Sequence, residues 1–491
     1  MFRTSRSPHR QRRRRLPCGG FVAITFVAAM LAGCSFVPSY HRPAVPAPAA
    51  WSDPAQASLA GTVPVASGWW HAYGDARLDA LVERGLHANH SLASAFASIE
   101  VARAAALKAG APLYPSLALN GTFNRRSAGG SSGSGSSSNG QSLFAEASYE
   151  IDFWGRNAAT ANSASMLARA AGFDCDTVAL TLTASIVDTW LQVQSLRRRV
   201  ALAESVVADA AGTLDLLKAQ QAAGVATELQ VQQQRNALAT FRAAIPALRE
   251  QRDQNVHLLA TLVGAAPEGF DIETVALGSV PVPQPMPSLP ISLLDARPDI
   301  RAAEARLQAA NYDIGAARAA FFPNLTLTAD GGANGSALSR FLASPFASIA
   351  AALVAPVFDG GALRGQLHET EAASAKSVAD YKQAVVTALQ DVEDMLSAAS
   401  QQQAVELADR EAVDAARKAA QLADAQYRSG TVDFLTVLDT ERALSQSEDA
   451  LEQAHLARLQ ASVGLFRAFG GGLGVTERSS VPPAAGAPNA S

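Results

Sequence analysis

Apolar side chains recur at seven-residue intervals between residues 361 and 469, and this spacing limits what the chain can fold into more than any other feature. The rows are Val378, Val385 and Val392, then Leu389 and Leu396, and, after a break, Val437, Leu444 and Leu451. Such spacing is typical of helices that pack along a coiled-coil seam. The break contains Gly430, so we expect the chain to turn there and to form two long antiparallel helices over residues 361–469.

A second stretch, at about residues 158–263, carries the same pattern. Its apolar row is Ala179, Ile186, Val193, Val200, Val207 and Leu214. We expect this stretch to form another long hairpin that turns near Gly224. Pro246 lies inside the predicted return helix and should kink it, because proline removes one backbone hydrogen bond and crowds the preceding turn.

The two hairpins belong to an internal duplication. At an offset of 208 residues the segment that leads to Pro115 matches the segment that leads to Pro323, and at an offset of 206 Gly224 matches Gly430. Two matches in the same order predict two copies of one structural unit. We therefore divide the chain after residue 68 into a first repeat at 69–278, a proline-rich linker at 279–290, a second repeat at 291–470 and a flexible tail at 471–491.

Each repeat also contains two stretches in which apolar and polar residues alternate, the pattern of half-buried strands. The expected strands lie at about 115–126, 141–153, 323–334 and 345–358. Residues 127–140 are almost entirely Gly and Ser and predict a flexible exposed loop. In the second strand the acidic residues Glu146, Glu150 and Asp152 share one face, and the opposite face is apolar.

The N-terminus predicts export and lipidation. Seven arginines without any acidic residue precede a short apolar run at residues 21–30, and Leu31-Ala-Gly-Cys34 follows. This order is that of a secretory signal, and the apolar run is too short to span a bilayer as a stable helix. The segment resembles bacterial lipoprotein signals, which implies cleavage after residue 33 and acylation of the Cys34 thiol and amine; Ser35 at the next position favours the outer membrane. Residues 34–68 are rich in Pro and Ala and predict an extended lipidated tether.

Composition and motifs exclude several classes of function. Without the seven N-terminal arginines the chain has 33 basic and 44 acidic residues, a formal charge of −11, which argues against nucleic acid as a partner. Cys175 would have no partner for a disulfide. The sequence has no phosphate-binding loop, no His-Glu-x-x-His and no Cys-x-x-Cys, so we expect no enzyme, no metal and no cofactor besides the lipid on Cys34.

Four strands with one apolar face pose a closure problem. Unpaired strand edges are not tolerated in lipid, and the smallest membrane barrels need about eight strands. Either several copies of the chain pool their strands, or the sheet is soluble and covered by another element. Lipidation toward the outer membrane favours the first alternative. We therefore predict an α+β membrane protein with long coiled-coil hairpins and four transmembrane strands per chain.

The chain then resembles a known family. Arg297-Pro298-Asp299-Ile300, Phe322-Pro323 and Leu435-Thr-Val-Leu-Asp439-Thr-Glu-Arg442 look like the TolC-like outer-membrane efflux family, in its OprM-like lipoprotein branch, over nearly all of the mature chain. The resemblance implies a homotrimer with a shared 12-stranded barrel and a hollow helical barrel in the periplasm. It also implies a periplasmic adaptor and an inner-membrane RND-type pump as partners, with small molecules as the exported cargo.

The resemblance also implies roles for individual residues. Tyr427, Asp439 and Arg442 match the positions that close the periplasmic tip in this family, and a ring of such charges can hold a constriction shut. The alternative is a solvated intrahelical pair worth about 0.3–0.5 kcal/mol. Gly224 and Gly430 would be tip turns that contact the adaptor, or simple helix ends. Glu146, Glu150 and Asp152 would face the lumen, as a weak cation filter or, more simply, as a wetted wall.

Two other functions remain open at the level of sequence. One is a coiled-coil envelope lipoprotein without a pore, although such a spacer has no need of long half-apolar strands. A duct for secreted proteins would use the same fold with a different cargo. Lipidation and the motif that begins at Arg297 favour the efflux of small molecules.

Overall fold

The computed structural model describes most of the chain. The described residues are 36–45, 48, 50–51, 65, 67–128, 136–285, 290–335 and 345–472. The predicted signal peptide, Cys34, most of the tether and nearly all of the tail lie outside these residues.

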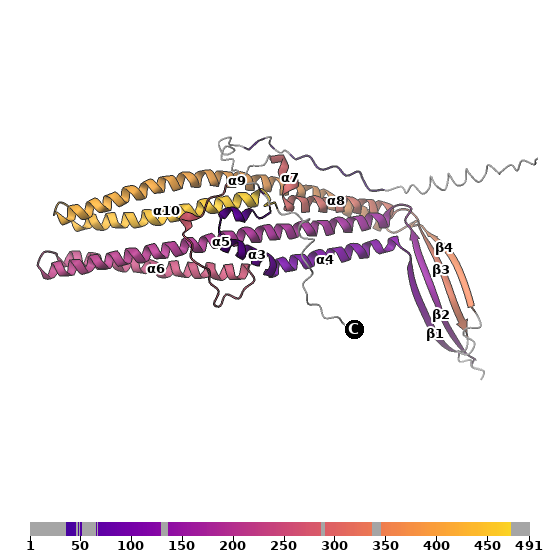
Figure 1. Cartoon of the computed structure of the whole chain (residues 1–491). Helices are drawn as coiled ribbons and strands as arrows, with labels where there is room; N and C mark the ends of the chain where they lie inside the picture. Colours follow the sequence, from indigo (N-terminus) through magenta and orange to yellow (C-terminus); the bar gives the residue numbers. More distant parts are fainter. Residues whose placement is uncertain are drawn as a thin grey trace, which may run out of the picture. The chain divides into compact units, whose positions relative to one another are not determined.

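Two long helical hairpins are the largest elements (Figure 1). They are formed by α5 (Arg156–Ala222) with α6 (Glu228–Leu262), and by α9 (Ala362–Arg428) with α10 (Phe434–Ala468). In both hairpins the first helix has 67 residues and the second has 35. At 1.5 Å per residue these helices are about 100 Å and about 50 Å long. The equal lengths support the duplication inferred from the sequence.

The predicted apolar rows lie mainly in the interior. Ile186 and Val193 of α5 are fully buried, and so are Val385 and Val392 of α9. Each buried aliphatic side chain of this size contributes about 1.5–3 kcal/mol. The prediction of two long helical hairpins is therefore confirmed. Helix α6 continues through Pro246, whose expected kink stays a prediction.

Shorter helices precede each hairpin. Those before α5 are η1 (Trp69–Tyr73), α3 (Ala76–Ala88), α4 (His90–Gly110) and η2 (Ala111–Leu113); those before α9 are η3 (Leu277–Ser279), η4 (Pro290–Ser292), α7 (Leu293–Ala296) and α8 (Pro298–Ala319). The break between α3 and α4 falls at Asn89. The Asn89 side chain accepts the Leu92 N–H at 2.9 Å, which starts the next helix.

Four antiparallel strands form one sheet in the order β1-β2-β3-β4 (Figure 1). They are β1 (Ser116–Ala128), β2 (Ser136–Ile151), β3 (Asn324–Gly335) and β4 (Pro345–Val354). The expectation of a loop over residues 127–140 is wrong at both ends. Ala128 pairs with Ser136, because backbone hydrogen bonds continue the ladder even where Gly and Ser offer no side-chain pattern.

The two faces of the sheet differ in polarity. Successive side chains of a strand point to opposite faces, so the register sorts the residues. One face carries Asn120, Glu146, Thr328, Asp330 and Ser348. The other carries large apolar side chains, several of them more than two-thirds exposed: Leu117, Leu119, Phe123, Ile349 and Leu353. An exposed apolar face of this extent is typical of a surface that is covered by lipid or by another protein.

By their internal contacts the residues form two compact units. Unit 1 lies within residues 1–40, 106–164 and 310–374 and contains all four strands. Unit 2 lies within residues 41–105, 165–309 and 375–491 and contains α6, α10 and most of α5 and α9. Each unit draws on both repeats. The repeats predicted from the sequence are therefore units of duplication and not separate compact bodies.

The described part of the N-terminal tether is bound to the rest of the chain. In unit 1 the Phe36 ring stacks on Phe322 with 4.5 Å between ring centroids, and Trp154 packs beside both. In unit 2 the Arg42 guanidinium donates two hydrogen bonds to the Glu304 carboxylate, at 2.7 and 2.9 Å. Bidentate pairs of this kind have a defined geometry. Where it is described, this segment is thus an irregular stretch docked on the rest of the chain rather than a free linker.

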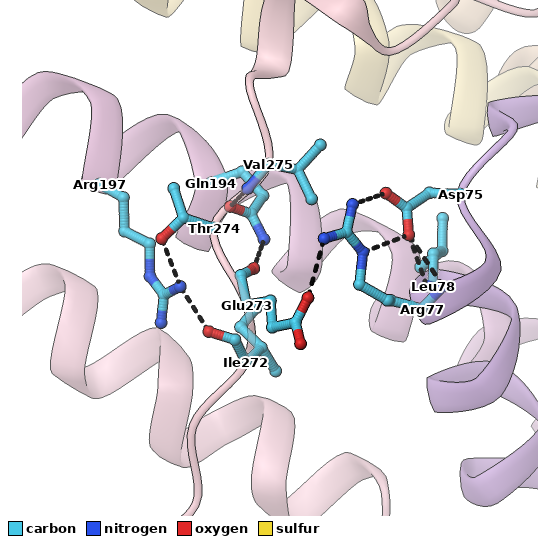
Figure 2. Close-up of polar contacts among 9 residues, drawn as sticks. All are labelled: Asp75, Arg77, Leu78, Gln194, Arg197, Ile272, Glu273, Thr274 and Val275. Carbon is cyan, nitrogen blue, oxygen red and sulfur yellow. Dashed lines mark hydrogen bonds and ion pairs between the residues drawn. The ribbon is translucent and has the colours of Figure 1, made fainter.

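The segment after α6, residues 271–283, will be called the strap (Figure 2). Gln194 of α5 binds the strap backbone twice: its Nε2 donates to the Glu273 carbonyl at 2.9 Å, and its Oε1 accepts the Val275 N–H at 2.9 Å. Arg197, three residues on, donates to Thr274 Oγ1 at 3.0 Å. Gln194 is fully buried, and its side-chain amide satisfies two backbone groups of the strap as a neighbouring strand would.

Helix α3 binds the same part of the strap (Figure 2). Arg77 Nη1 donates to Glu273 Oε2 at 3.0 Å, and the Asp75 carboxylate accepts from the same guanidinium at 2.8 and 3.1 Å. The hydrogen bond from Arg77 holds the pKa of Asp75 below its usual range. The strap is therefore fixed by α3 and α5 at one end, and its other end reaches α10, as described below.

Candidate functional site

The second hairpin tip contains the three predicted gate residues, and Tyr427 lies in the last turn of α9. Its ring centroid is 5.5 Å from that of Phe434 in the first turn of α10. Its hydroxyl oxygen lies 3.5 Å from Gln230 Nε2 of α6, a long hydrogen bond. An aromatic pair of this kind contributes about 0.5–1.5 kcal/mol beyond the area it buries. Tyr427 thus links both helices of its own hairpin and reaches the first hairpin.

Asp439 and Arg442 lie one turn apart on α10. The closest distance between the Arg442 guanidinium and the Asp439 carboxylate is 3.7 Å, too long for a hydrogen bond. Both side chains are well exposed, at 64% for Asp439 and 41% for Arg442. The structure brings these two residues together, and it places Tyr427 on the facing helix of the same tip. Their role as a gate stays a prediction.

An apolar core joins the two hairpin tips. It is built from small and branched side chains of all four long helices: Ala210, Leu214, Leu217, Val231, Ala237, Leu238, Ala423, Phe434, Val437 and Leu438. Because the core contains residues of both hairpins, a movement of either tip disturbs the same packed cluster. The tips are therefore mechanically coupled within one chain.

Glu441 is a tip residue that the sequence reasoning missed. It lies between Asp439 and Arg442 but is directed toward the other helices. Burial raises the pKa of Glu441, and the neighbouring carboxylates Asp424 and Asp209 raise it further. Its position, three residues after Leu438 of the tip core, is the signal that could have revealed it, because an acid on the apolar face of a helix is unusual.

The two tip turns share one backbone geometry. Gly224 has φ +78° and Gly430 has φ +75°, values that favour glycine. Thr227 caps the helix after the first turn through a reciprocal pair with Gln230, and Asp433 caps the helix after the second turn. A Cβ on either glycine would meet nothing within 4 Å, so the surface of both turns is open to a partner.

The acidic residues predicted to face a lumen have separate roles in the sheet. Glu146 accepts a hydrogen bond from Asn120 of the neighbouring strand at 3.0 Å. Glu150 forms an ion pair with Arg156 at 2.7 Å. Asp152 lies beyond the end of β2, and its Oδ2 accepts the Ala158 N–H of the first turn of α5 at 2.7 Å. The assignment of Asp152 to the strand face is therefore wrong, because the strand has ended and the carboxylate caps a helix.

Asp330 is a third acid on the polar face of the sheet, beside Glu146 and Glu150, and the sequence analysis did not select it. It lies opposite Glu146 in the pairing of β2 with β3. Its carboxylate accepts from the Ser348 hydroxyl at 3.0 Å, and Asn120 holds Glu146 from the other side. Like charges in directly opposed positions repel. The pair gives this face a local negative potential.

Arg297, in the motif that resembles the efflux family, connects several helices of the fold. Its guanidinium donates to Asp299 at 2.7 Å, to Asp391 of α9 at 3.0 Å and to the Ala468 carbonyl of α10 at 3.2 Å. The side chain is about nine-tenths buried, and a buried cation needs such partners. Arg297 thus joins the start of α8 to both helices of the second hairpin.

No helix among the described residues is both long and apolar enough to cross a bilayer. No group of His, Cys, Asp and Glu side chains in the described ranges could hold a metal ion.

A half-apolar sheet with two tandem hairpins of long helices defines the class of TolC-like outer-membrane channels. The chain matches the family described as outer membrane efflux protein over residues 81–265 and 289–471. It therefore belongs to this family, and it is a protein of the outer membrane.

Individual relatives agree with the family. The pyoverdine export outer membrane protein OpmQ of Pseudomonas putida is 36% identical over 90% of this chain and 95% of its own length. The outer membrane protein OprJ of Pseudomonas aeruginosa is 33% identical over 93% of this chain and 97% of its own length. Among solved structures, the outer-membrane channel OprN has a TM-score of 0.83 at 30% identity and covers 89% of this chain and 98% of its own.

Proposed function

We propose that the chain forms the outer-membrane exit duct of a tripartite efflux system. The observation that carries this proposal is the sheet, which has one polar face, one exposed apolar face and, within the described residues, a single paired neighbour for each of the outer strands β1 and β4. Membrane-spanning backbone must satisfy its hydrogen bonds inside the protein. Four strands cannot do this alone.

Three copies would close the sheet. Twelve strands exceed the minimum of about eight for a membrane barrel. In such a trimer the edge of β1 in one copy pairs with the edge of β4 in the next, and the polar face lines a water-filled lumen. The long hairpins of the three copies would continue the duct as a helical barrel in the periplasm, because their half-buried rows need neighbouring helices to cover them.

The partners of the duct would be a periplasmic adaptor and an inner-membrane RND-type pump. The tips support the adaptor contact, since Val225 and Leu229 beside the first turn are 76% and 66% exposed. Exposed apolar side chains next to an open glycine turn are typical of a docking surface. Gly224 and Gly430 would be the points of contact, and Tyr427, Asp439 and Arg442 the closure above them.

A lipid on Cys34 would anchor the chain to the outer membrane. The modification would be a diacylglycerol on the thiol and an acyl chain on the amine. Two or more acyl chains give stable attachment, whereas one gives only marginal binding. The docking of Phe36 against Phe322, two residues after the proposed lipid site, supports a fixed position for this end of the chain.

The cargo would be small organic molecules. The name of OpmQ specifies pyoverdine export, which makes pyoverdine the first compound to test alongside drugs and dyes. The acids Glu146 and Asp330 would line the lumen and favour cations weakly. A duct without a specific binding site suits a pump that selects cargo elsewhere.

Intracellular accumulation tests the proposal. Cells that lack the gene, with and without a plasmid copy, would be loaded with a panel of drugs, dyes, pyoverdine and metal ions. The proposal predicts that several unrelated organic compounds accumulate and that the plasmid reverses this. Unchanged accumulation of every compound would exclude small-molecule efflux and direct the work to secreted proteins.

A further inference from the structure

A buried carboxylate joins α9 to α10 in the middle of the second hairpin. The Glu406 side chain is 1% exposed. Its oxygens accept from Arg458 Nη1 at 2.8 Å and from Arg410 Nη2 at 2.5 Å, and His455 Nδ1 lies 3.1 Å away. Burial alone raises the pKa of Glu406, but the hydrogen bonds from Arg458 and His455 outweigh it and lower the pKa. Glu406 is therefore an ionised carboxylate and only accepts hydrogen bonds.

The His455 ring lies between two acceptors. Nδ1 faces Glu406 Oε1 at 3.1 Å, and Nε2 faces the Leu277 carbonyl oxygen at 3.3 Å. A carbonyl and an ionised carboxylate cannot donate. A neutral imidazole has one N–H, so it can satisfy only one of the two and turns a lone pair toward the other. Both hydrogen bonds form together only when the ring is an imidazolium.

Leu277 belongs to the strap, so His455 connects the strap to the second hairpin. Residues 271–275 of the strap are held by Gln194 and Arg197 of α5 and by Arg77 of α3. Farther along, the Ser462 hydroxyl of α10 donates to the Pro283 carbonyl. Amides, guanidinium groups and hydroxyls keep one protonation state between about pH 5 and 8, whereas histidine does not.

The other charged groups around His455 are already paired. On α9 these are Glu406 and Arg410. On α10 Arg458 bonds to Glu406, and Glu452 and Asp449 pair with Arg198 and Arg199 of α5. Within the described residues, the strap presents only its backbone carbonyl to the ring. The two ring nitrogens of His455 therefore face one carboxylate and one carbonyl.

We propose that His455 is a proton-sensitive clasp that ties the second hairpin to the strap. As an imidazolium the ring holds Glu406 and Leu277 together. As a neutral ring it keeps only one of these hydrogen bonds, so the link from Glu406 to Leu277 is lost, while the hydrogen bond from Ser462 to Pro283 remains. Asp439 and Arg442 lie 16 and 13 residues before His455 on α10, about 20–24 Å away along the helix. Release of the clasp therefore favours movement of the predicted gate.

The direction of the pH dependence follows from the number of N–H donors on the His455 ring. The protonated ring makes both hydrogen bonds, so their combined stabilisation is present where the ring is charged and is lost once the proton leaves as pH rises. The clasp is closed at lower pH and open at higher pH. The effect on gating rests on the proposed function, whereas the effect on the strap does not.

Hydrogen–deuterium exchange of the purified protein tests the clasp. After correction for the intrinsic rate, the protection of strap peptides should fall about fivefold between about pH 6 and about pH 8, the size of one net hydrogen bond. His455→Gln should remove this dependence on pH, and His257→Gln, on the exposed side of α6, should keep it. A wild-type strap with equal protection at both values overturns the proposal, even where the His455→Gln protein does not fold. A dependence that persists in folded His455→Gln also overturns it.

Conductance in planar bilayers tests the link to gating. The wild-type channel should open more often at about pH 8 than at about pH 6 on the side of the hairpins, and His455→Gln should open equally at both values. Conductance that does not depend on pH, together with the predicted exchange, would overturn the gating half of the proposal. Absence of any conductance in the wild-type protein would contradict the proposed duct and leave the exchange result to judge the clasp alone.

Discussion

The closest atoms of the Asp439 carboxylate and the Arg442 guanidinium are 3.7 Å apart on the exposed face of α10. This pair is too open to contribute much to the stability of one chain, and exposed pairs contribute about 0.2–1 kcal/mol. Its charges are therefore available to groups outside the chain, as a gate between copies requires.

The gate can be tested by removing its charges. Asp439→Ala and Arg442→Ala should change the free energy of unfolding by less than about 0.5 kcal/mol, because the pair is exposed. They should nevertheless raise the frequency of open events in planar bilayers, because each removes a charge of the proposed gate. Asp215→Ala removes one member of a similarly spaced exposed pair with Lys218 on α5 and should leave conductance unchanged. Equal conductance in all variants would exclude these residues from the gate.

The half-buried Asp188 of α5 should make stability depend on pH. Burial raises the pKa of Asp188 to about 7, and Arg467 lowers it by a smaller amount. The unfolded chain ionises this group near pH 3.9. The folded protein therefore loses stability as pH rises from about 4 to about 7, by about 3 kcal/mol. Asp188→Asn should be more stable than the wild type at pH 8 and nearly equal to it at about pH 4.

Chemical denaturation at the two pH values measures this difference. Asp215→Asn, on an exposed part of the same helix, is the matched control and should show no gain at pH 8. A loss of stability for Asp188→Asn at pH 8 would show that the ionised carboxylate has a stabilising partner.

Replacing glycine by alanine should have opposite effects on stability in a tip turn and inside a long helix. Gly430→Ala places a side chain at φ +75° and should lower the free energy of unfolding by about 1–2 kcal/mol. Gly212 lies inside α5 with open space around it, so Gly212→Ala should raise it by about 0.5–1 kcal/mol. Thermal unfolding measures both. Stabilisation by Gly430→Ala would mean that the turn does not hold the left-handed conformation.

The lipid anchor has a direct chemical test. The intact mass of the mature wild-type protein should exceed that of a polypeptide that begins at Cys34 by the mass of its acyl groups. Cys34→Ser should lose the modification, because serine has no thiol. A mature protein of unmodified mass, or one that begins elsewhere, would contradict the assignment.

The long helices could be predicted because one physical pattern extends over many residues. Ile186, Val193, Val385 and Val392 repeat at seven-residue spacing, and burial of such a row is what stabilises a long hairpin. The turn at Gly430 could be predicted as well, since only glycine adopts its backbone conformation at no cost. Duplication then fixed the order of elements in the other half.

Other features depend on contacts that no local pattern encodes. Residues 136–140 join β2 through backbone hydrogen bonds, which any residue except proline can donate. Glu406 is buried against a helix that is distant in sequence, and Glu441 is partly buried in the same way. The hydrogen-bond partners of Gln194 lie about 80 residues away in the sequence. From the sequence alone, Gln194 therefore cannot be told from a surface glutamine. Such sites require the fold before they can be recognised.

The proposed duct requires several copies of the chain. Native mass spectrometry of the protein, extracted from outer membranes in mild detergent, counts these copies. We expect a particle of three copies, because four strands with two open edges cannot span a membrane alone. A particle of one copy that retains its folded sheet would contradict the proposed duct.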